Sequence, residues 1–126
     1  MKIARLLHDT GGTAAIEFAI ISSVYIMLLF GIIEGGYALY YQLGVQHGAE
    51  MAARCASVNS TTCGSTSAIK TYASGQSYGL SPPVSVFTVS TPSCGNKVDA
   101  SYTYSFLGNF WGVMTVTLTG SSCFPK

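Results

Sequence analysis

The sequence predicts an α+β fold, with a long N-terminal helix and a small three-stranded antiparallel sheet packed on the outer half of that helix. Two observations carry this prediction. Residues 13–57 contain no proline and keep helix-compatible residues throughout. Further on, hydrophobic and polar side chains alternate along residues 98–106 and 114–119, which is the period of two that β-strands show. The 126 residues leave room for one small domain plus a membrane segment.

The first half of the predicted helix, residues 14–33, is apolar all round, and we expect it to cross a membrane. Glu17 is its only charge. A carboxylate at mid-bilayer costs about 2.5–3.5 kcal/mol, so a chain that keeps one is expected to place it near an interface or beside a partner. Glu34 follows about 26 Å along the helix and marks the opposite interface.

The outer half of the helix, residues 34–57, is amphipathic. The larger apolar residues, together with Ala52, are expected to pack against the following domain: Tyr37, Leu39, Tyr40, Leu43, Met51 and Ala52. The polar residues are expected to face water: Gln42, Gln46, Glu50 and Arg54.

Glycines are frequent in this helix although each weakens a helix by up to about 1 kcal/mol relative to alanine. Gly31 and Gly35, and then Gly44 and Gly48, have the small-xxx-small spacing that allows two helices to approach closely. We therefore predict helix–helix packing at these four positions. Local flexibility is the alternative interpretation.

Residues 58–126 are predicted to form a small extracytoplasmic α+β domain with disulfides. A polar loop, 58–67, precedes a short helix that places Ala68, Ile69 and Tyr72 on one face. A weaker strand, 84–89, joins the two alternating strands through connections at 91–96 and 107–112, which gives an antiparallel meander. Its apolar face is expected to cover the outer half of the long helix.

All four cysteines follow the apolar stretch, and an even number of them in an exported domain indicates disulfides. Three pairings are possible. We favour Cys94 with Cys123, because the end of the third strand of a meander lies beside the turn before the second strand. Cys55 and Cys63 then close a short loop. Free buried thiols are the alternative.

Several function classes have no support in the sequence. The charges nearly balance and only 9% of residues are charged, so no basic patch favours nucleic-acid binding. No C-x-x-C spacing is present and the histidines lie far from any cysteine pair, so we predict no metal site. No nucleophile–base group or phosphate-binding glycine loop occurs either; we predict no catalytic residues, no cofactor and no enzyme activity.

Residues 1–12 have the character of a short leader, with Lys2 and Arg5 ahead of a Gly12-Thr13 junction. Under the positive-inside rule these basic residues keep the N-terminus in the cytoplasm. The domain after the apolar segment then lies on the periplasmic or extracellular side.

The stretch Gly12-Thr-Ala-Ala-Ile-Glu-Phe18 resembles the processing and assembly motif of the type IV pilin superfamily. More closely, GGTAAIEFAIISSVYIMLLFGIIEGGYALY is similar to the N-terminal segment of TadE-like pseudopilins of the tight-adherence (Tad/Flp) pilus system. The resemblance covers about residues 11–57.

The resemblance implies that a prepilin peptidase cuts after Gly12 at the cytoplasmic face, so that Thr13 becomes the new N-terminus. It also implies that Glu17, followed by Phe18, meets the N-terminal amine of a neighbouring subunit during assembly. The expected partners are the peptidase, other pilin-like subunits, the pilus assembly platform and membrane lipid. The protein would then be a minor pseudopilin of the bacterial inner membrane, with a role in pilus assembly and adhesion.

Two other functions remain open at this point. One is a secreted binding module released from a conventional signal peptide, and the other is a single-pass anchored domain whose leader is never cut. Glu17 likewise has two simpler interpretations: it reaches lipid headgroups, or it is an N-terminal charge favoured by the helix dipole.

Overall fold

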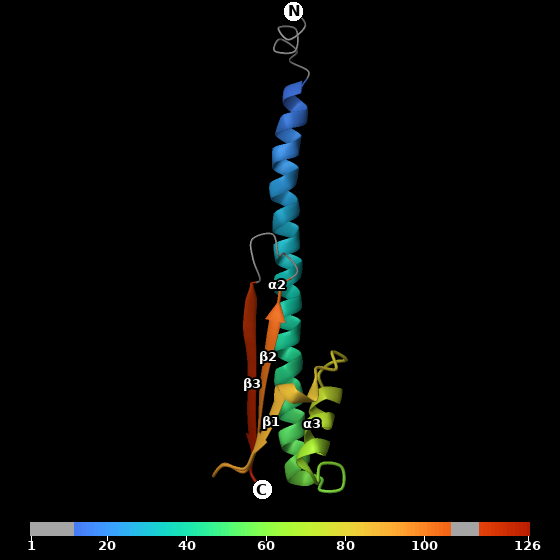
Figure 1. Ribbon diagram of the computed structural model, residues 1–126, viewed down its shortest axis with the longest axis vertical. Helices are drawn as coiled ribbons and strands as arrows, with labels where there is room; N and C mark the ends of the chain where they lie inside the picture. The colour runs from blue at the N-terminus through green and yellow to red at the C-terminus, as the bar shows by residue number, and fades with distance from the viewer. Residues whose placement is uncertain (1–11, 107–113) are drawn as a thin grey trace, which may run out of the picture. The chain divides into compact units, whose positions relative to one another are not determined.

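The computed structural model describes residues 12–106 and 114–126. Most of the predicted leader, with Lys2 and Arg5, and the predicted connection at 107–112 lie outside the described residues. The elements follow in the order α2 (Thr13–Val58), α3 (Thr66–Gly75), the 3-10 turn η2 (Val84–Val86), β1 (Phe87–Ser90), β2 (Asn96–Ser105) and β3 (Thr115–Phe124) (Figure 1). The predicted α+β class is confirmed.

The chain divides into two compact units, Met1–Gly35 and Gly36–Lys126. The described part of the first unit is helical and has no core of its own: its large apolar side chains are exposed. The second unit, called the C-terminal unit below, contains the outer part of α2 together with α3 and the sheet.

The sheet is an antiparallel meander, as predicted, with strand order β1-β2-β3. The predicted strand at 84–89 is wrong in its first half, because Val84–Val86 form η2 and β1 begins at Phe87. Phe87 of β1 pairs with Ala100 of β2, and Val98 of β2 pairs with Ser122 of β3. β3 is longer than the sequence pattern indicated, because it continues through Gly120 to Phe124. Cys123 therefore lies inside the strand, opposite Lys97, and not beyond it.

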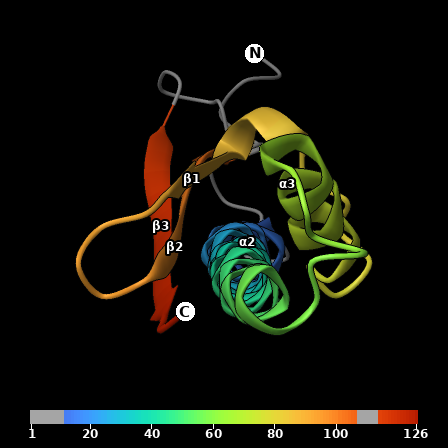
Figure 2. The ribbon, with the colours of Figure 1, turned by 90° about the horizontal axis from the view of Figure 1, so that it is seen from below.

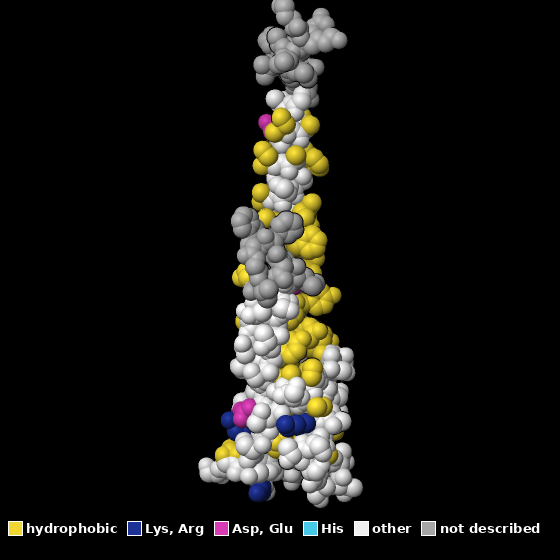
Figure 3. Space-filling view, in the orientation of Figure 1, with side chains coloured by type: hydrophobic (Ala, Val, Ile, Leu, Met, Phe, Trp, Pro, Cys, Tyr) yellow, Lys and Arg dark blue, Asp and Glu magenta, His cyan; other side chains and the backbone are white. Residues whose placement is uncertain are grey.

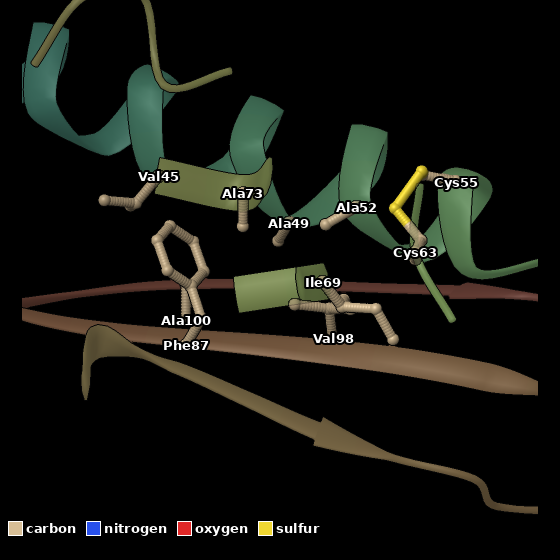
Figure 4. Close-up of a cluster of buried hydrophobic side chains, with 11 residues drawn as sticks. Val45, Ala49, Ala52, Cys55, Cys63, Ile69, Ala73, Phe87, Val98 and Ala100 are labelled. Carbon is tan, nitrogen blue, oxygen red and sulfur yellow. A yellow bond between two sulfur atoms is a disulfide. The ribbon is translucent and has the colours of Figure 1, made fainter. Parts of the chain in front are cut away.

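The core of the C-terminal unit lies where α2, α3 and the sheet meet. Viewed along α2, the sheet and α3 lie at different sides of the helix (Figure 2). Phe87 is fully buried, and its ring lies near Val45 and Ala49 of α2 and Ala73 of α3 (Figure 4). Except for Phe87, the residues that fill this cluster are small or medium-sized: Val45, Ala49, Ala52, Ala53, Cys55, Cys63, Ile69, Ala73, Val98 and Ala100.

A smaller cluster lies where the other end of β2 meets α2. Ala38, Tyr104 and Leu118 are buried together. Tyr41 of α2 stacks on Tyr102 with ring centroids 5.2 Å apart. The predicted apolar face of β2 therefore does pack on the helix.

The predicted packing face of the outer helix is wrong for most of its residues. Tyr37, Leu39, Tyr40 and Leu43 are exposed, and of the six residues in that prediction Ala52 alone is fully buried. The helix packs through small residues instead: Ala38, Gly44, Val45, Gly48, Ala49, Ala52, Ala53 and Cys55.

The physical reason is the short distance between backbones. A Cβ atom on Gly120 of β3 would lie 3.0 Å from the Cα of Gln46, so strand and helix are too close for large side chains between them. Gln42 and Gln46, expected to face water, hydrogen-bond to β3 instead. The Nε2 of Gln42 donates to the carbonyl oxygen of Thr119, and the Oε1 of Gln46 accepts from the backbone N–H of Ser121. These side chains satisfy backbone groups of β3 that β2 does not reach.

The short predicted helix is α3, and Ser65 caps it. Its hydroxyl accepts a hydrogen bond from the backbone N–H of Ala68, which would otherwise have no partner in the first turn. Ile69 and Ala73 are buried against the core, while Ala68 and Tyr72 are half-buried.

Candidate functional site

The Gly12-Thr13 junction lies where α2 begins. Thr13 is the first residue of the helix, and Gly12 precedes it on an exposed backbone. A Cβ atom added at Gly12 would meet nothing within 4 Å, and its φ does not fall in the left-handed region that favours glycine. The fold of this chain therefore does not require glycine at position 12. A requirement that originates outside the chain, such as fit to an enzyme, explains it better.

Glu17 and Phe18 lie one helical turn after the junction and both are exposed, Phe18 to 73%. Residues four apart on a helix are neighbours on one face, with Cβ atoms about 5–6 Å apart. The start of α2 thus presents Thr13 and Glu17 side by side, with Phe18 on the adjacent face.

The other polar side chains of the apolar stretch are satisfied by the helix itself. The hydroxyls of Ser22 and Ser23 donate to the carbonyl oxygens of Ala19 and Ile20. Glu17 differs from these serines because it carries a charge. It lies near the start of α2, where the first N–H groups of the helix lack an intrahelical partner and favour a negative charge. A cationic partner would stabilise it further in an apolar environment.

Around Glu17 the helix is suited to lipid. Its most apolar stretch has a mean hydropathy of 2.3 and none of it is buried, so α2 is long and apolar enough to cross a membrane. The exposed large side chains point in all directions around the axis, including Ile16, Ile20, Tyr25, Met27, Phe30 and Ile33.

The four glycines predicted to pack against helices fall into two groups. At Gly48, a Cβ atom would collide with the Ser77 hydroxyl and lie 2.6 Å from the carbonyl oxygen of Ala73 in α3. At Gly44, it would lie 2.5 Å from a methyl carbon of Leu80. These two glycines thus admit α3 and the segment after it. Gly31 and Gly35 have nothing within 4 Å, so helix packing there would need another chain and stays a prediction.

The cysteines form two disulfides, which join Cys55 to Cys63 and Cys94 to Cys123. The first links the last turn of α2 to the loop that follows it. The second links the β1–β2 turn to β3. This is the pairing that the sequence analysis favoured, and both links lie in the C-terminal unit.

Two titratable groups of the sheet have shifted pKa values. The Lys97 ammonium, 2.8 Å from a carboxylate oxygen of Asp99, and the Ser121 hydroxyl lower the pKa of Asp99. Burial, with Tyr41 as neighbour, raises the pKa of Tyr102. Both groups are far along the chain from the Gly12-Thr13 junction, and each shift follows from an ordinary packing contact.

Other features of the described residues do not suggest a reactive centre. Residues 12–106 and 114–126 contain no group of three or more His, Cys, Asp or Glu side chains that could hold a metal ion. An open depression of about 520 Å³ lies beside α3 and is lined by uncharged residues, among them Thr62, Thr71, Tyr72 and Gln76. None of the residues predicted for processing or assembly lines it.

Several contacts of α2 have no signal in the local sequence. Tyr40 donates a hydrogen bond from its hydroxyl to the carbonyl oxygen of Tyr78, 2.7 Å away, and His47 stacks on the Tyr78 ring. Tyr78 has a φ of 51°, which is unusual for a residue other than glycine. These contacts join residues far apart in the chain, and no local pattern could have indicated them.

Comparison with known families identifies the segment that contains the junction. Residues 12–54 match the family model described as TadE-like protein. This segment is TadE-like. The match begins at Gly12 and ends just before Cys55, so it covers the junction, Glu17, Phe18 and the four paired glycines. No curated protein and no solved structure matches the chain.

The TadE-like match confirms the resemblance found in the sequence and supports a pilin-like protein associated with the Tad pilus. TadE-like proteins are structural components of the pilus system and are not an enzyme family. The sheet and both disulfide links, at residues 55–124, lie outside the matched range.

Proposed function

We propose that the protein is a minor pilin-like subunit for assembly of a Tad-type pilus, cleaved between Gly12 and Thr13 and assembled through α2. The observation that carries this proposal is that the family match and the helix begin at neighbouring residues. The TadE-like match starts at Gly12, and the helix starts at Thr13. A cut at this bond would therefore leave a subunit that begins at the first residue of its helix.

The proposed cut hydrolyses one amide bond and creates a charge. It leaves the carboxylate of Gly12 on the leader and the α-amine of Thr13 on the subunit. An α-amine has a reference pKa near 8, so most of it is protonated at neutral pH. The partner in this step is a membrane-embedded prepilin peptidase acting at the cytoplasmic face. The exposed Gly12, which the fold leaves unconstrained, suits a narrow active site.

Glu17 then provides the matching negative charge. In the proposed assembly, its carboxylate meets the Thr13 amine of a neighbouring subunit within a bundle of helices. A buried ion pair adds little net stability, but leaving either charge alone in an apolar bundle costs about 3–5 kcal/mol. The pair therefore sets the register between subunits more than it adds to affinity.

The location follows from the same arrangement. Residues 14–33 cross the inner membrane with the N-terminus in the cytoplasm, and the C-terminal unit lies on the periplasmic side or on the pilus. The two disulfides support this orientation, because such bonds persist in oxidising compartments. The partners are other pilin-like subunits, the assembly platform and membrane lipid. The chain is longer than very short major pilins, which favours a minor role.

N-terminal sequencing of the protein extracted from membranes of its native host tests the processing step. A start at Thr13 is expected. A start beyond Tyr37 would indicate a secreted domain freed from a signal peptide, and an intact Met1 would indicate an uncut single-pass anchor. Either of these results would contradict the proposal.

A variant pair sharpens the same test. Gly12→Leu should retain the leader and run at a higher mass on an immunoblot. Gly31→Leu is the matched control, because Gly31 is likewise exposed with nothing within 4 Å, and it should be cut normally. Normal cutting of both variants would remove Gly12 from the recognition step.

A second pair tests assembly. Glu17→Ala should be inserted and cut but should no longer co-purify with other pilus subunits. Ser22→Ala, which removes a polar group from the same apolar stretch, should co-purify normally. Equal recovery of both variants with pilus subunits would show that Glu17 has no role in assembly.

A further inference from the structure

Four large apolar side chains of the C-terminal unit are exposed on α2 just after the apolar segment. They are Tyr37, Leu39, Tyr40 and Leu43, called the collar here, and they are exposed to 56%, 67%, 44% and 62%. The sequence analysis assigned them to the core, but small residues occupy that position instead. The collar therefore needs another explanation.

The collar surrounds part of α2 rather than forming one face. At about 100° per residue, Tyr40 and Leu43 point away from Ala38, whereas Tyr37 and Leu39 lie about a quarter turn to either side of it. The unit leaves all four side chains exposed, and Tyr40 donates a hydrogen bond to the segment after α3. Hydrophobic side chains on this part of α2 are visible at the surface in Figure 3.

The part of α2 that contains the collar lacks charged residues. Between Glu34 and Glu50 the helix carries no Asp, Glu, Lys or Arg, whereas a solvated helix face normally carries several. In the C-terminal unit the charged side chains gather at the far end of the face in Figure 3. The charged residues of the C-terminal unit are Glu50, Arg54, Lys70, Lys97, Asp99 and Lys126.

The described ends of β2 and β3 lie near Ala38 of α2. Ala38 of α2 packs with Tyr104 and Leu118, close to where Phe106 donates its backbone N–H to the carbonyl oxygen of Met114. The Met114 side chain is exposed to 72%. The end of the unit that joins the apolar segment is thus apolar on both the helix and the hairpin.

A comparison of the length of α2 with the thickness of a bilayer indicates that lipid covers the collar. From Glu17 to Glu34 the helix rises about 26 Å, which is shorter than the hydrocarbon core of a typical bilayer, about 30 Å. From Phe18 to Leu43 it rises about 38 Å, close to the 40–45 Å that includes the headgroup layers. The collar supplies the apolar length that the charge-free stretch lacks. Tyrosine is also a residue that membrane interfaces favour.

We propose that the collar, together with the exposed Met114 before β3, lies in the outer headgroup layer of the membrane and seats the C-terminal unit on the lipid surface. The proposal rests on α2 crossing the membrane, but not on cleavage at Gly12. If Glu17 lies at the inner boundary of the hydrocarbon core, Glu34 lies about 4–5 Å inside the outer boundary and the collar begins at that boundary. The unit would accordingly rest against the bilayer before assembly, with its charged end turned to water.

Tryptophan fluorescence in lipid vesicles tests this. The single tryptophan of the chain is removed by Trp111→Phe, and Tyr40→Trp is introduced into the full chain. The vesicles contain phosphatidylcholine and phosphatidylglycerol, with bromine on the acyl chains near the headgroup. Val58→Trp is the matched control, because Val58 is an exposed apolar residue on the same helix, 74% accessible and about 27 Å farther along.

Tryptophan at position 40 should emit at shorter wavelength than tryptophan at 58, be quenched by the brominated lipid and lose most of its quenching by acrylamide. Equal acrylamide quenching at 40 and 58 would overturn the proposal. If lipid dilution restores acrylamide access at position 40, a second protein chain covers the collar, which also overturns it.

Ile26→Trp tests the membrane span separately from the collar. Quenching at position 26 by lipid brominated deep in the acyl chains, without quenching at 40, would overturn the collar and leave the membrane span intact. Loss of quenching at both positions would remove the span, and the collar with it. Neither result bears on cleavage after Gly12, which N-terminal sequencing measures separately.

Discussion

The two parts of α2 use opposite kinds of residue for their contacts. From Thr13 to Gly35 the surface consists of large apolar side chains that the protein leaves exposed. From Gly36 to Val58 the contacts within the protein are made by alanine, glycine, valine and cysteine. One continuous helix thus combines a segment suited to lipid with a segment suited to a protein core.

This difference shows that apolar character alone does not indicate whether protein or lipid contacts a helix. In a protein core, neighbouring elements approach closely and small residues on the helix make room for them. At Gly48 a neighbouring backbone carbonyl occupies the space that a side chain would need, while Gly31 has nothing near it. In lipid, by contrast, large side chains meet fluid acyl chains that adjust to their shape.

The largest expected effect separates two phenylalanines. Phe87 is fully buried in the core, whereas Phe30 is 64% exposed. Phe87→Ala should lower the free energy of unfolding of the C-terminal unit by about 3–5 kcal/mol, because it removes a buried ring and leaves a cavity. Phe30→Ala should leave that value unchanged. Denaturant unfolding of the full chain in micelles, followed by near-UV circular dichroism, measures both, and equal losses would erase the distinction between the two parts.

The disulfides give the next effect. Replacing Cys94 and Cys123 with alanine should cost about 3–4 kcal/mol, because their link closes the longer loop, with a sequence separation of 29. Replacing Cys55 and Cys63 should cost about 2–3 kcal/mol, since that separation is 8. The same unfolding experiment measures both values. Insertion of α2 into vesicles should be unaffected, because both links lie outside the apolar segment; a loss of insertion would contradict this.

A pair of glycines tests the comparison within the helix itself. Gly48→Ala should destabilise the C-terminal unit by about 1–3 kcal/mol, because the new methyl group meets the carbonyl oxygen of Ala73 and the Ser77 hydroxyl. Gly31→Ala meets nothing and should raise the helical content slightly, by the usual preference for alanine over glycine. Thermal unfolding reports the first change and far-UV circular dichroism the second. A stabilising Gly48→Ala would mean that α3 does not pack there.

Much of this architecture follows from local pattern. The helix start at Thr13, the alternation along β2 and the order of the meander are all written in short stretches of sequence, because the periods of 3.6 and 2 do not depend on distant residues. The predicted helix end at residue 57 differs from the observed end by one residue. The favoured cysteine pairing follows from the same topology.

The face of the outer helix could not be predicted in this way. Tyr37 and Leu43 are more hydrophobic than Gly44 and Gly48, yet the glycines are the buried ones. The choice depends on how closely α3 and β3 approach, which involves residues such as Ala73 and Gly120 that come later in the chain. Gln42 and Gln46 are misassigned for the same reason, since the β3 backbone groups that they bind are distant in sequence. The role of Glu17 depends on a second chain and stays a prediction.

The smallest expected effect concerns pH in the C-terminal unit. The pKa of Asp99 is lowered by Lys97 and Ser121, so the folded state favours the ionised carboxylate. The resulting stability is present above the unfolded pKa, near 3.8, and is lost as pH falls through the lower folded value. Because the pair is partly exposed, its contribution is small. Asp99→Asn should flatten this part of the stability curve in acid unfolding, and an unchanged acid dependence would exclude Asp99 as its source.

The central claim is that α2 faces lipid in its first part and protein at its outer end. Labelling with a lipid-dissolved photoactivated carbene reagent, followed by peptide mapping by mass spectrometry, tests it most directly. The account predicts strong labelling of residues 14–33, which continues on the collar, and none on the buried residues Ala49, Ala52 and Ala53. Uniform labelling along the whole helix, or labelling confined to its outer end, would contradict it.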